Sequence, residues 1–427
     1  DKLSGSIEFE TANKYSSIVL IQHCLSARNL FETMEEVKLI QEAEKNFFND
    51  RIYSSQVRKR KQVRLQGIRN QCILRMNHMV IGGNSLDVTL INQPNHRLSP
   101  SVAATLSNNN ELKQLLKVKA EKLAKLHIID ARGAIITQRD LQALKRILTR
   151  AKNLQTVSIY FIKQIFIKKI LYGLMHTEKL EGLELKRSNL SGRLGGILSA
   201  IGKNTLTTLD LRMNEIDHEA VPRLANGSNW NSLRSLVLTN NNIGCLGAAS
   251  LSKNVTWSSI RVIHLTNNNI GDAGAKSLAE NVSWVFLNEL HLPLNNIQDE
   301  GACALACNAA WKNLTRLNLA INMIGVAGAQ GLSQNSSWIK LQVLKLQENH
   351  VGPEGAAYLF QNKAWSNLDH IDLSRNGVRD EGAVKISECC CYKKICSIYL
   401  LSNKISAIGE NALKTLREKL PNIKVLY

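Results

Sequence analysis

Residues 257–283 read WSSIRVIHLTNNNIGDAGAKSLAENVS, and this 27-residue pattern is copied along the second half of the chain. The chain has six tryptophans, each 27 residues from the next: Trp230, Trp257, Trp284, Trp311, Trp338 and Trp365. Eight asparagines keep the same interval: Asn214, Asn241, Asn268, Asn295, Asn322, Asn349, Asn376 and Asn403. A fixed period of this length indicates that one structural unit is stacked along an axis. We therefore expect function to lie in an extended surface rather than in a catalytic cleft.

Within one unit, the apolar residues change from a strand spacing to a helix spacing. Ile263 and Leu265 alternate, as in a short strand that buries one face. Asn268 follows that strand, where its amide can bond loop backbone that no sheet partner reaches. Asp272 is a candidate helix N-cap, and the small residues after it let a helix pack close to the strand layer. Each unit is therefore predicted to be strand, loop, helix and return.

The same spacing recurs in eight clear units and becomes irregular at both ends of the array. Tyr392 takes the tryptophan position in the last unit, and residues 420–427 are a candidate closing strand. Upstream, Leu180, Leu183 and Leu185 keep the strand spacing, but Ser188 stands where asparagine is expected. Atypical end units suit an array that must cap its exposed core.

Together, the LxxLxLxxNxI strand segment and the small-residue helix segment resemble the ribonuclease-inhibitor-like class of leucine-rich repeat, over roughly residues 154–427. The resemblance implies an α/β solenoid, a curved horseshoe with parallel strands on the concave face and helices on the convex face. Spacing favours the same curvature, because neighbouring strands lie about 4.8 Å apart and packed helices about 8–10 Å apart. The strict period and the tryptophans depart from the class. We interpret the tryptophans as a core ladder.

Positive charge is concentrated upstream of the regular array. The net charge is +19; residues 51–200 carry 27 basic and 8 acidic side chains, and residues 201–427 carry 22 and 18. We predict a basic, mainly helical N-terminal region over residues 1–150, including at most a degenerate first repeat, and a leucine-rich repeat array over residues 151–427. A basic cluster can contact nucleic acid or lipid, although a solvated helix face is the simpler explanation. Weak contact of residues 51–200 with an anionic membrane or nucleic acid stays as an alternative.

Composition argues against a membrane-spanning or secreted disulfide-rich protein. We find no stretch near the ~20 apolar residues that a membrane span needs and no signal peptide. Nine cysteines is an odd number, which favours a reducing compartment and a cytoplasmic protein. The cluster of Cys389, Cys390, Cys391 and Cys396 lies in ordinary repeat register, without the second ligand pair of a zinc site. The glycosylation sequons at Asn254, Asn281 and Asn335 are likewise products of the repeat.

The residues between the core leucines of each strand should point into the concave face. They vary from unit to unit while the leucines stay fixed, as expected of a recognition surface. The candidate partner-binding residues are Asp210, Arg212, His264, His291, Arg316, Asn318, Lys345, Asp372, Arg375 and Tyr399. Aromatic residues and arginines are frequent energetic anchors in interfaces. His264 and His291 should be neighbours on adjacent strands, but no third ligand is evident, so no metal site is expected.

No catalytic motif emerges from the sequence. Gly202 and Lys203 lack the upstream glycine of a phosphate-binding loop, and no GxSxG elbow is present. The repeats are similar to the arrays of NOD-like receptors, Ran GTPase-activating proteins and secreted bacterial effectors. We therefore expect a non-catalytic, monomeric scaffold that binds a protein partner, with no cofactor and no small-molecule substrate. One form of this hypothesis is a secreted effector in the host cytosol. The alternative is a GTPase-activating protein, although the acidic tail of the Ran activators is absent.

Overall fold

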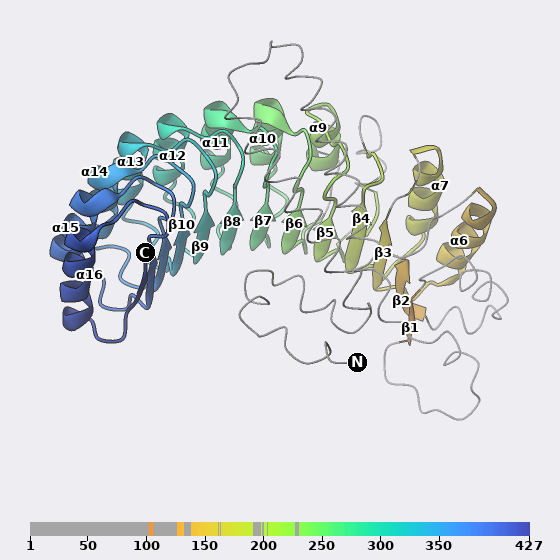
Figure 1. Ribbon diagram of the computed structural model, residues 1–427. Coiled ribbons are helices and arrows are strands. Elements are labelled where there is room, and N and C mark those ends of the chain that lie inside the picture. The colour runs from red at the N-terminus through yellow and green to blue at the C-terminus, as the bar shows by residue number, and fades with distance from the viewer. Residues whose placement is uncertain are drawn as a thin grey trace, which may run out of the picture.

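The chain builds a curved solenoid around a single sheet. A computed structural model describes residues 102–105, 126–131, 138–160, 162, 164–190, 198, 200–202, 204–226 and 230–427. Its 13 strands lie in chain order in one sheet, and the paired strands run parallel throughout. The strands line the inner side of the arc and the helices its outer side (Figure 1). The predicted α/β solenoid, with parallel strands on the concave face and helices on the convex face, is confirmed.

The elements alternate along the array, as the repeat predicts. The strands are β1 (Val102–Thr105), β2 (Leu126–Ala131), β3 (Thr156–Tyr160), β4 (Gly182–Lys186), β5 (Thr208–Asp210), β6 (Ser235–Val237), β7 (Val262–His264), β8 (Glu289–His291), β9 (Arg316–Asn318), β10 (Val343–Lys345), β11 (His370–Asp372), β12 (Ser397–Tyr399) and β13 (Lys424–Leu426). The helices are α6 (Gln138–Arg150), α7 (Gln164–Leu174), α9 (Ala220–Asn226), α10 (Gly244–Ser252), α11 (Gly271–Ala279), α12 (Asp299–Ala306), α13 (Val326–Ser333), α14 (Gly352–Phe360), α15 (Arg379–Cys389) and α16 (Ala407–Lys419).

The sheet begins upstream of the regular repeats. Strands β1 and β2 pair in parallel and lead into β3, so two strands lie within the stretch assigned to the N-terminal region. The predicted helical character of residues 1–101, including the basic cluster from Arg58 to Arg64, lies outside the described residues. Downstream, β13 pairs with β12, which confirms a strand in the predicted closing segment.

The tryptophans form a buried ladder beside the leucine core. All six are at most 1% exposed, and the rings of Trp338 and Trp365 stack at 6.4 Å between centroids and 13° between planes. The indole N–H of Trp230 donates to the Ile201 carbonyl at 2.7 Å. By contrast, the indole N–H groups of Trp284, Trp311, Trp338 and Trp365 have no acceptor among the described residues. In these four units the tryptophan fills volume rather than making a hydrogen bond.

A ladder of asparagines after the strands joins successive units. The Asn295 amide donates to the Leu265 carbonyl at 2.8 Å, one unit back. Its carbonyl oxygen accepts from the backbone N–H groups of Asn268 and Ile270 at 3.0 and 3.3 Å. The predicted role of the asparagine series is confirmed. At the irregular end, Ser188 takes part of that role, because its hydroxyl accepts from the Ile162 N–H at 3.2 Å.

A second asparagine ladder lies three residues before the tryptophans. Asn281 donates to the Ser252 carbonyl at 2.6 Å, and its own carbonyl accepts from the Trp284 N–H at 3.0 Å. Asn254 and Asn335 are buried in the same way. These three side chains stabilise the segment that leads from each helix back to the next strand. Because they are buried, they are inaccessible to glycosylation in the folded state.

Three helix starts, those of α12, α13 and α16, are capped by an aspartate of the neighbouring unit, which corrects the sequence expectation for Asp272. Asp272 does not cap its own helix α11; its carboxylate accepts from the N–H groups of Gln298 and Gly301, at 2.7 and 2.8 Å, where α12 begins. Asp299 does the same for α13, and Asp380 for α16. A carboxylate at a helix N-terminus satisfies unpaired N–H groups and complements the helix dipole. These aspartates therefore stabilise the contact between neighbouring units as well as the N-termini of the helices.

The helices approach closely because their facing residues are small. A Cβ atom on Gly274 would lie 3.1 Å from the Ala248 Cβ of the preceding helix and 2.5 Å from Ile270 Cγ2. Only glycine therefore fits there without a shift in the packing.

Candidate functional site

The strand register brings most of the predicted site residues into one line across the concave face. Pairing places seven of the ten in consecutive rungs, interrupted only by Val237: Asp210, His264, His291, Asn318, Lys345, Asp372 and Tyr399. Arg212 follows two residues after Asp210, and Arg316 lies in the row before this line. Arg375 lies beyond β11, in the loop that joins the strand to α15. It therefore lies on the rim of the horseshoe, the edge formed by the loops that lead from the strands to the helices, rather than on the concave sheet.

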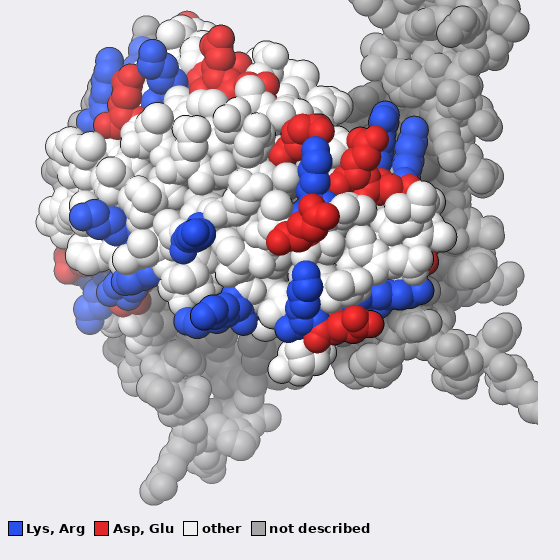
Figure 2. Space-filling model, turned by 90° about the vertical axis from the view of Figure 1, so that its left-hand side faces the viewer, with Lys and Arg blue, Asp and Glu red and all other residues white. Residues whose placement is uncertain are grey.

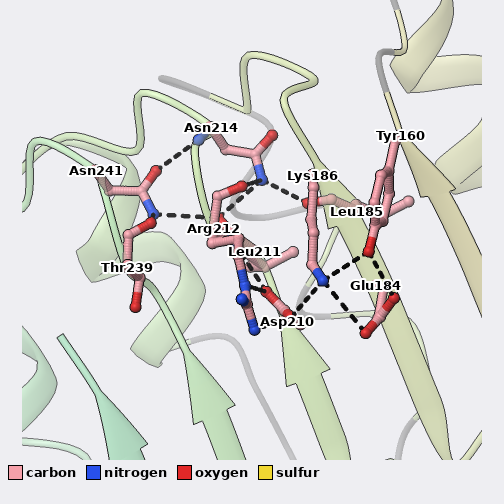
Figure 3. A network of polar contacts seen from close by, with 10 residues as sticks. All are labelled: Tyr160, Glu184, Leu185, Lys186, Asp210, Leu211, Arg212, Asn214, Thr239 and Asn241. Carbon is pink, nitrogen blue, oxygen red and sulfur yellow. Dashed lines mark hydrogen bonds and ion pairs between the residues drawn. The ribbon is translucent and has the colours of Figure 1, made fainter. Parts of the chain in front are cut away.

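At the N-terminal end of the concave face, polar side chains form a closed network (Figure 3). The Lys186 ammonium lies 3.0 Å from the Asp210 carboxylate and 3.4 Å from that of Glu184, and it donates to the Tyr160 hydroxyl at 2.7 Å. Arg212 binds both oxygens of Asp210, with its Nη2 at 2.7 Å and its Nε at 3.0 Å. The two negative charges, of Glu184 and Asp210, equal in number the two positive charges, of Lys186 and Arg212. The polar groups at this end of the concave face therefore already have partners within the protein.

The network holds its cations in their charged forms. Burial by itself lowers the pKa of the Lys186 ammonium, but the hydrogen bond to Tyr160 and the carboxylates of Asp210 and Glu184 outweigh burial and raise that pKa. Burial is likewise outweighed at Arg212, where Asp210 raises the pKa of the guanidinium. A lysine that acts as a base or nucleophile needs a lowered pKa. The arrangement is thus suited to structure or recognition rather than to proton transfer.

Two histidines stack at the middle of the face. The rings of His264 and His291 lie 4.0 Å apart between centroids, with 13° between their planes. His291 Nε2 contacts the Glu289 carboxylate at 3.1 Å. Burial and the facing His291 ring lower the pKa of His264 to about 4. Burial also lowers the pKa of His291, and Glu289 offsets only part of that effect. Both rings are therefore neutral near pH 7.

The C-terminal part of the face has few internal contacts. In the part of the chain that the structure describes, the side chains of Lys345 and Tyr399 make no hydrogen bond or ion pair. Asn318 and Asp372 bond only backbone two residues on, at Ala320 and Ser374, with distances of 3.1 and 3.0 Å. These polar groups remain available to a ligand.

Metal binding and thiol chemistry find no support in the described ranges. No three His, Cys, Asp or Glu side chains gather there as ligands for a metal ion. Within the cysteine cluster, burial raises the pKa of the Cys390 thiol to about 11, which makes the thiolate scarce at neutral pH. Among the described helices, none has the length and apolar character needed to cross a bilayer.

Sequence reasoning missed two parts of this surface. Tyr160, Glu184 and Lys186 were not among the candidates. Glu184 and Lys186 lie one unit before Asp210 and Arg212, and Tyr160 lies two units before them. The opposite charges of Glu184 and Lys186 beside those of Asp210 and Arg212 were a usable signal. The rim was also missed. There the structure exposes Leu294, Ile321 and Met323, and the signal was the change from polar to apolar residue at two repeat positions, that of Leu294 and Ile321 and that of Met323.

Comparison with known proteins supports the repeat assignment. Six segments match a family model described as Leucine Rich repeat, at residues 202–221, 231–252, 258–279, 285–306, 339–360 and 366–387. No curated protein sequence matches the chain.

Solved structures show a distant likeness in fold. An internalin from Listeria monocytogenes is 18% identical over 74% of this chain and 92% of its own, with a TM-score of 0.46. Rad7, solved with Elc1 in yeast, is 15% identical over 88% and 98%, with a TM-score of 0.46. TLR13, solved with ssRNA13, is 16% identical over 68% of this chain and 37% of its own, with a TM-score of 0.43.

Proposed function

The chain is a leucine-rich repeat protein, and we propose that it is a non-catalytic scaffold that binds a partner protein through the C-terminal part of its concave face. Solenoids of this kind present extended concave surfaces for binding. The observation that carries the proposal is the row from His264 to Tyr399, where residue type changes at every rung after His291 while the buried leucines beside it do not. The buried scaffold is thus the same from unit to unit, whereas the residues on the concave face differ.

The size and chemistry of this row suit a protein interface. The six rungs from β7 to β12 span about 24 Å at about 4.8 Å for each of the five gaps, which matches one side of a standard protein–protein interface. Lys345, Asp372 and Tyr399 supply a cation, an anion and an aromatic ring that make no hydrogen bond or ion pair with each other among the described residues. Such groups, surrounded by other contacts that exclude water, are suited to act as energetic anchors.

The test is affinity capture from eukaryotic lysate, with a variant that carries Lys345→Glu, Asp372→Lys and Tyr399→Ala. Arg212 is left unchanged because it is bound to Asp210, so its loss would confuse stability with binding. The matched control carries Lys276→Glu and Glu300→Lys, two exposed positions on the convex helices. We expect a protein captured by the wild type to be lost from the concave variant and kept by the control. Equal capture by all three would refute the concave site.

Two narrower hypotheses come from the resemblance. One is a secreted bacterial effector that acts, as a monomer, in the reducing host cytosol. The other is a GTPase-activating protein, which needs a side chain that can enter the partner's nucleotide site. Arg212 is bound to Asp210, and Arg375 contacts Glu348 at 3.1 Å, so neither arginine favours that role. Phosphate release from GTP-loaded small GTPases tests it, and we expect no acceleration.

Contact between the basic N-terminal segment and an anionic surface is a separate proposal. Lys145, Arg146 and Arg150 on α6, with Lys168 and Lys169 on α7, are exposed cations on neighbouring helices. Binding driven by such charges should fall steeply as salt is raised. Vesicles of neutral and anionic lipid, and duplex DNA, at two salt concentrations distinguish the targets. The opposite, C-terminal side of the molecule instead shows basic and acidic side chains interspersed (Figure 2).

A further inference from the structure

The loops that join the strands to the helices form one rim of the horseshoe, and this rim carries an apolar patch. Leu294, Ile321 and Met323 are 43, 37 and 43% exposed. They come from two consecutive units, after β8 and β9. Adjacent exposed apolar side chains rimmed by polar residues are typical of binding surfaces in soluble proteins.

Two of these residues stand in a backbone conformation that disfavours them. Leu294 has φ +56° and Ile321 has φ +54°, and a β-branched residue in the left-handed region is a genuine outlier. The same repeat position is Asn240, Asn267, Glu348, Arg375 and Ser402 in other units, and Met213 in the first clear unit. Asparagine tolerates that conformation. The fold therefore does not require an exposed isoleucine here, and strained residues of this kind cluster at functional sites.

The patch lines a hollow of about 360 Å³ whose remaining wall is made of amides. Asn296 donates to Asn269 at 2.7 Å, and Asn267 donates to Asn240 at 2.9 Å. Each primary amide has two donor hydrogens and an acceptor oxygen, so one bond to a neighbour leaves others for a ligand. An apolar floor beside a row of amides suits a peptide, whose side chain enters the hollow while its backbone bonds the wall.

A cationic hollow follows along the same rim. Its volume is about 540 Å³, and its lining includes Glu348, His350, Arg375, Arg379 and Lys404. The only acidic side chain in the lining, Glu348, contacts Arg375. Arg379 and Lys404 are exposed, and neither side chain has an ion pair among the described residues. The lining thus carries an excess of positive charge beside the apolar hollow.

We propose that this rim binds an extended segment of a partner protein that carries an apolar side chain and, further along, acidic residues. The units of Leu294 and Arg375 are three repeats apart. Three steps of about 4.8 Å give about 14 Å, which an extended peptide covers in about four residues at about 3.4 Å each. The segment therefore has its acidic residues about four positions from the apolar anchor. This inference goes beyond the concave site, because no concave residue takes part in it.

The test is selection of displayed random 12-residue peptides on the full chain, followed by affinity measurement of fluorescein-labelled winners. The key variant is Leu294→Asn with Ile321→Asn, which copies the residue that sister units use. We expect its Tm to be no lower than that of the wild type, while the affinity of the selected peptides falls at least tenfold. Arg379→Glu with Lys404→Glu should weaken the same peptides and reduce the salt dependence of their binding.

The selected sequences and one control decide the outcome. We expect Asp or Glu to be enriched about four positions from an aliphatic or aromatic residue. The concave variant of Lys345, Asp372 and Tyr399 should bind these peptides as the wild type does, so failure of the concave site and failure of the rim site are distinguishable. Absence of that enrichment, or equal binding of the peptides to the double-asparagine variant, overturns the proposal.

Discussion

The two ends of the concave face use similar polar residues in opposite ways. Across β3–β5, Lys186, Asp210 and Arg212 are bound to each other at 3.0 Å or less. Across β10–β12, Lys345 and Tyr399 make no side-chain hydrogen bond or ion pair to any described residue, and Asp372 bonds only nearby backbone. The scaffold beneath both ends is the same. Residue type alone therefore does not identify a binding surface; whether the polar groups are already paired does.

The difference has a physical consequence for binding. A partner that covered the N-terminal network would have to desolvate charges that already satisfy each other, and it would gain few new bonds. At the C-terminal end, each polar group can form its first strong contact with the partner. We therefore place the recognition surface on the C-terminal rungs and assign the N-terminal network to holding strands together.

The largest expected effect tests whether the scaffold is the same at both ends. Trp230→Ala and Trp365→Ala each remove a fully buried ring and should each lower the free energy of unfolding by about 3–5 kcal/mol. Trp230→Ala should cost about 1 kcal/mol more, because Trp230 also donates to Ile201. Urea denaturation measures both. A small effect at either position contradicts the core ladder, and a wide gap between them contradicts a uniform scaffold.

The next effect separates the two ends directly. Asp210→Ala leaves Lys186 and Arg212 without their shared carboxylate and should destabilise the protein by about 2–3 kcal/mol, because half-buried cations lose their partner. Asp372→Ala, the matched change at the other end, should alter stability by less than about 0.5 kcal/mol. Thermal unfolding of the pair measures the contrast. Equal destabilisation would show that the C-terminal aspartate is structural too.

The smallest effect concerns the histidine pair between the two ends. The unfolded chain protonates a histidine near pH 6.5, whereas the folded chain protonates His264 only near pH 4 because of burial and the facing His291 ring. Between these values the unfolded state binds more protons, so stability falls as the pH is lowered from 6.5 towards 4. Solvent screening at the partly exposed ring limits the loss to about 1 kcal/mol. His264→Asn should flatten this part of the stability profile; an unchanged profile would contradict the shift.

The repeated interior could be predicted from the sequence because the same residue pattern occurs in every unit. The tryptophan ladder, the strand frame and the bonding role of the asparagine series all follow from the 27-residue period. The partner of Asp272 could not be predicted, because its carboxylate reaches N–H groups 26 and 29 residues away. That contact depends on how far each helix is displaced relative to the next one, and the repeat period alone does not determine this displacement.

The site was predictable only as a set of positions. The sequence placed His264 and His291 on neighbouring strands, which the pairing of β7 with β8 confirms, and the structure adds that their rings stack. It did not distinguish Arg212, whose guanidinium is bound to Asp210 two residues earlier, from Lys345, because whether a side chain bonds a neighbour depends on rotamers that the repeat period does not specify. Arg375 was grouped with the concave residues, but it lies in a loop at φ +56°. Backbone conformation after the strand decides which residues turn onto the rim.

The most direct test of the central claim is the dissociation constant of the captured partner, measured by calorimetry with one variant from each end. The C-terminal variant carries Lys345→Glu, Asp372→Lys and Tyr399→Ala; the N-terminal variant is Tyr160→Phe, which removes one hydroxyl from the paired network. We expect the C-terminal variant to raise the Kd at least a hundredfold and the N-terminal variant to change it less than about threefold, because energetic anchors dominate binding. A Kd unchanged by the C-terminal variant, or raised equally by both, would contradict the assignment of recognition to the unpaired end.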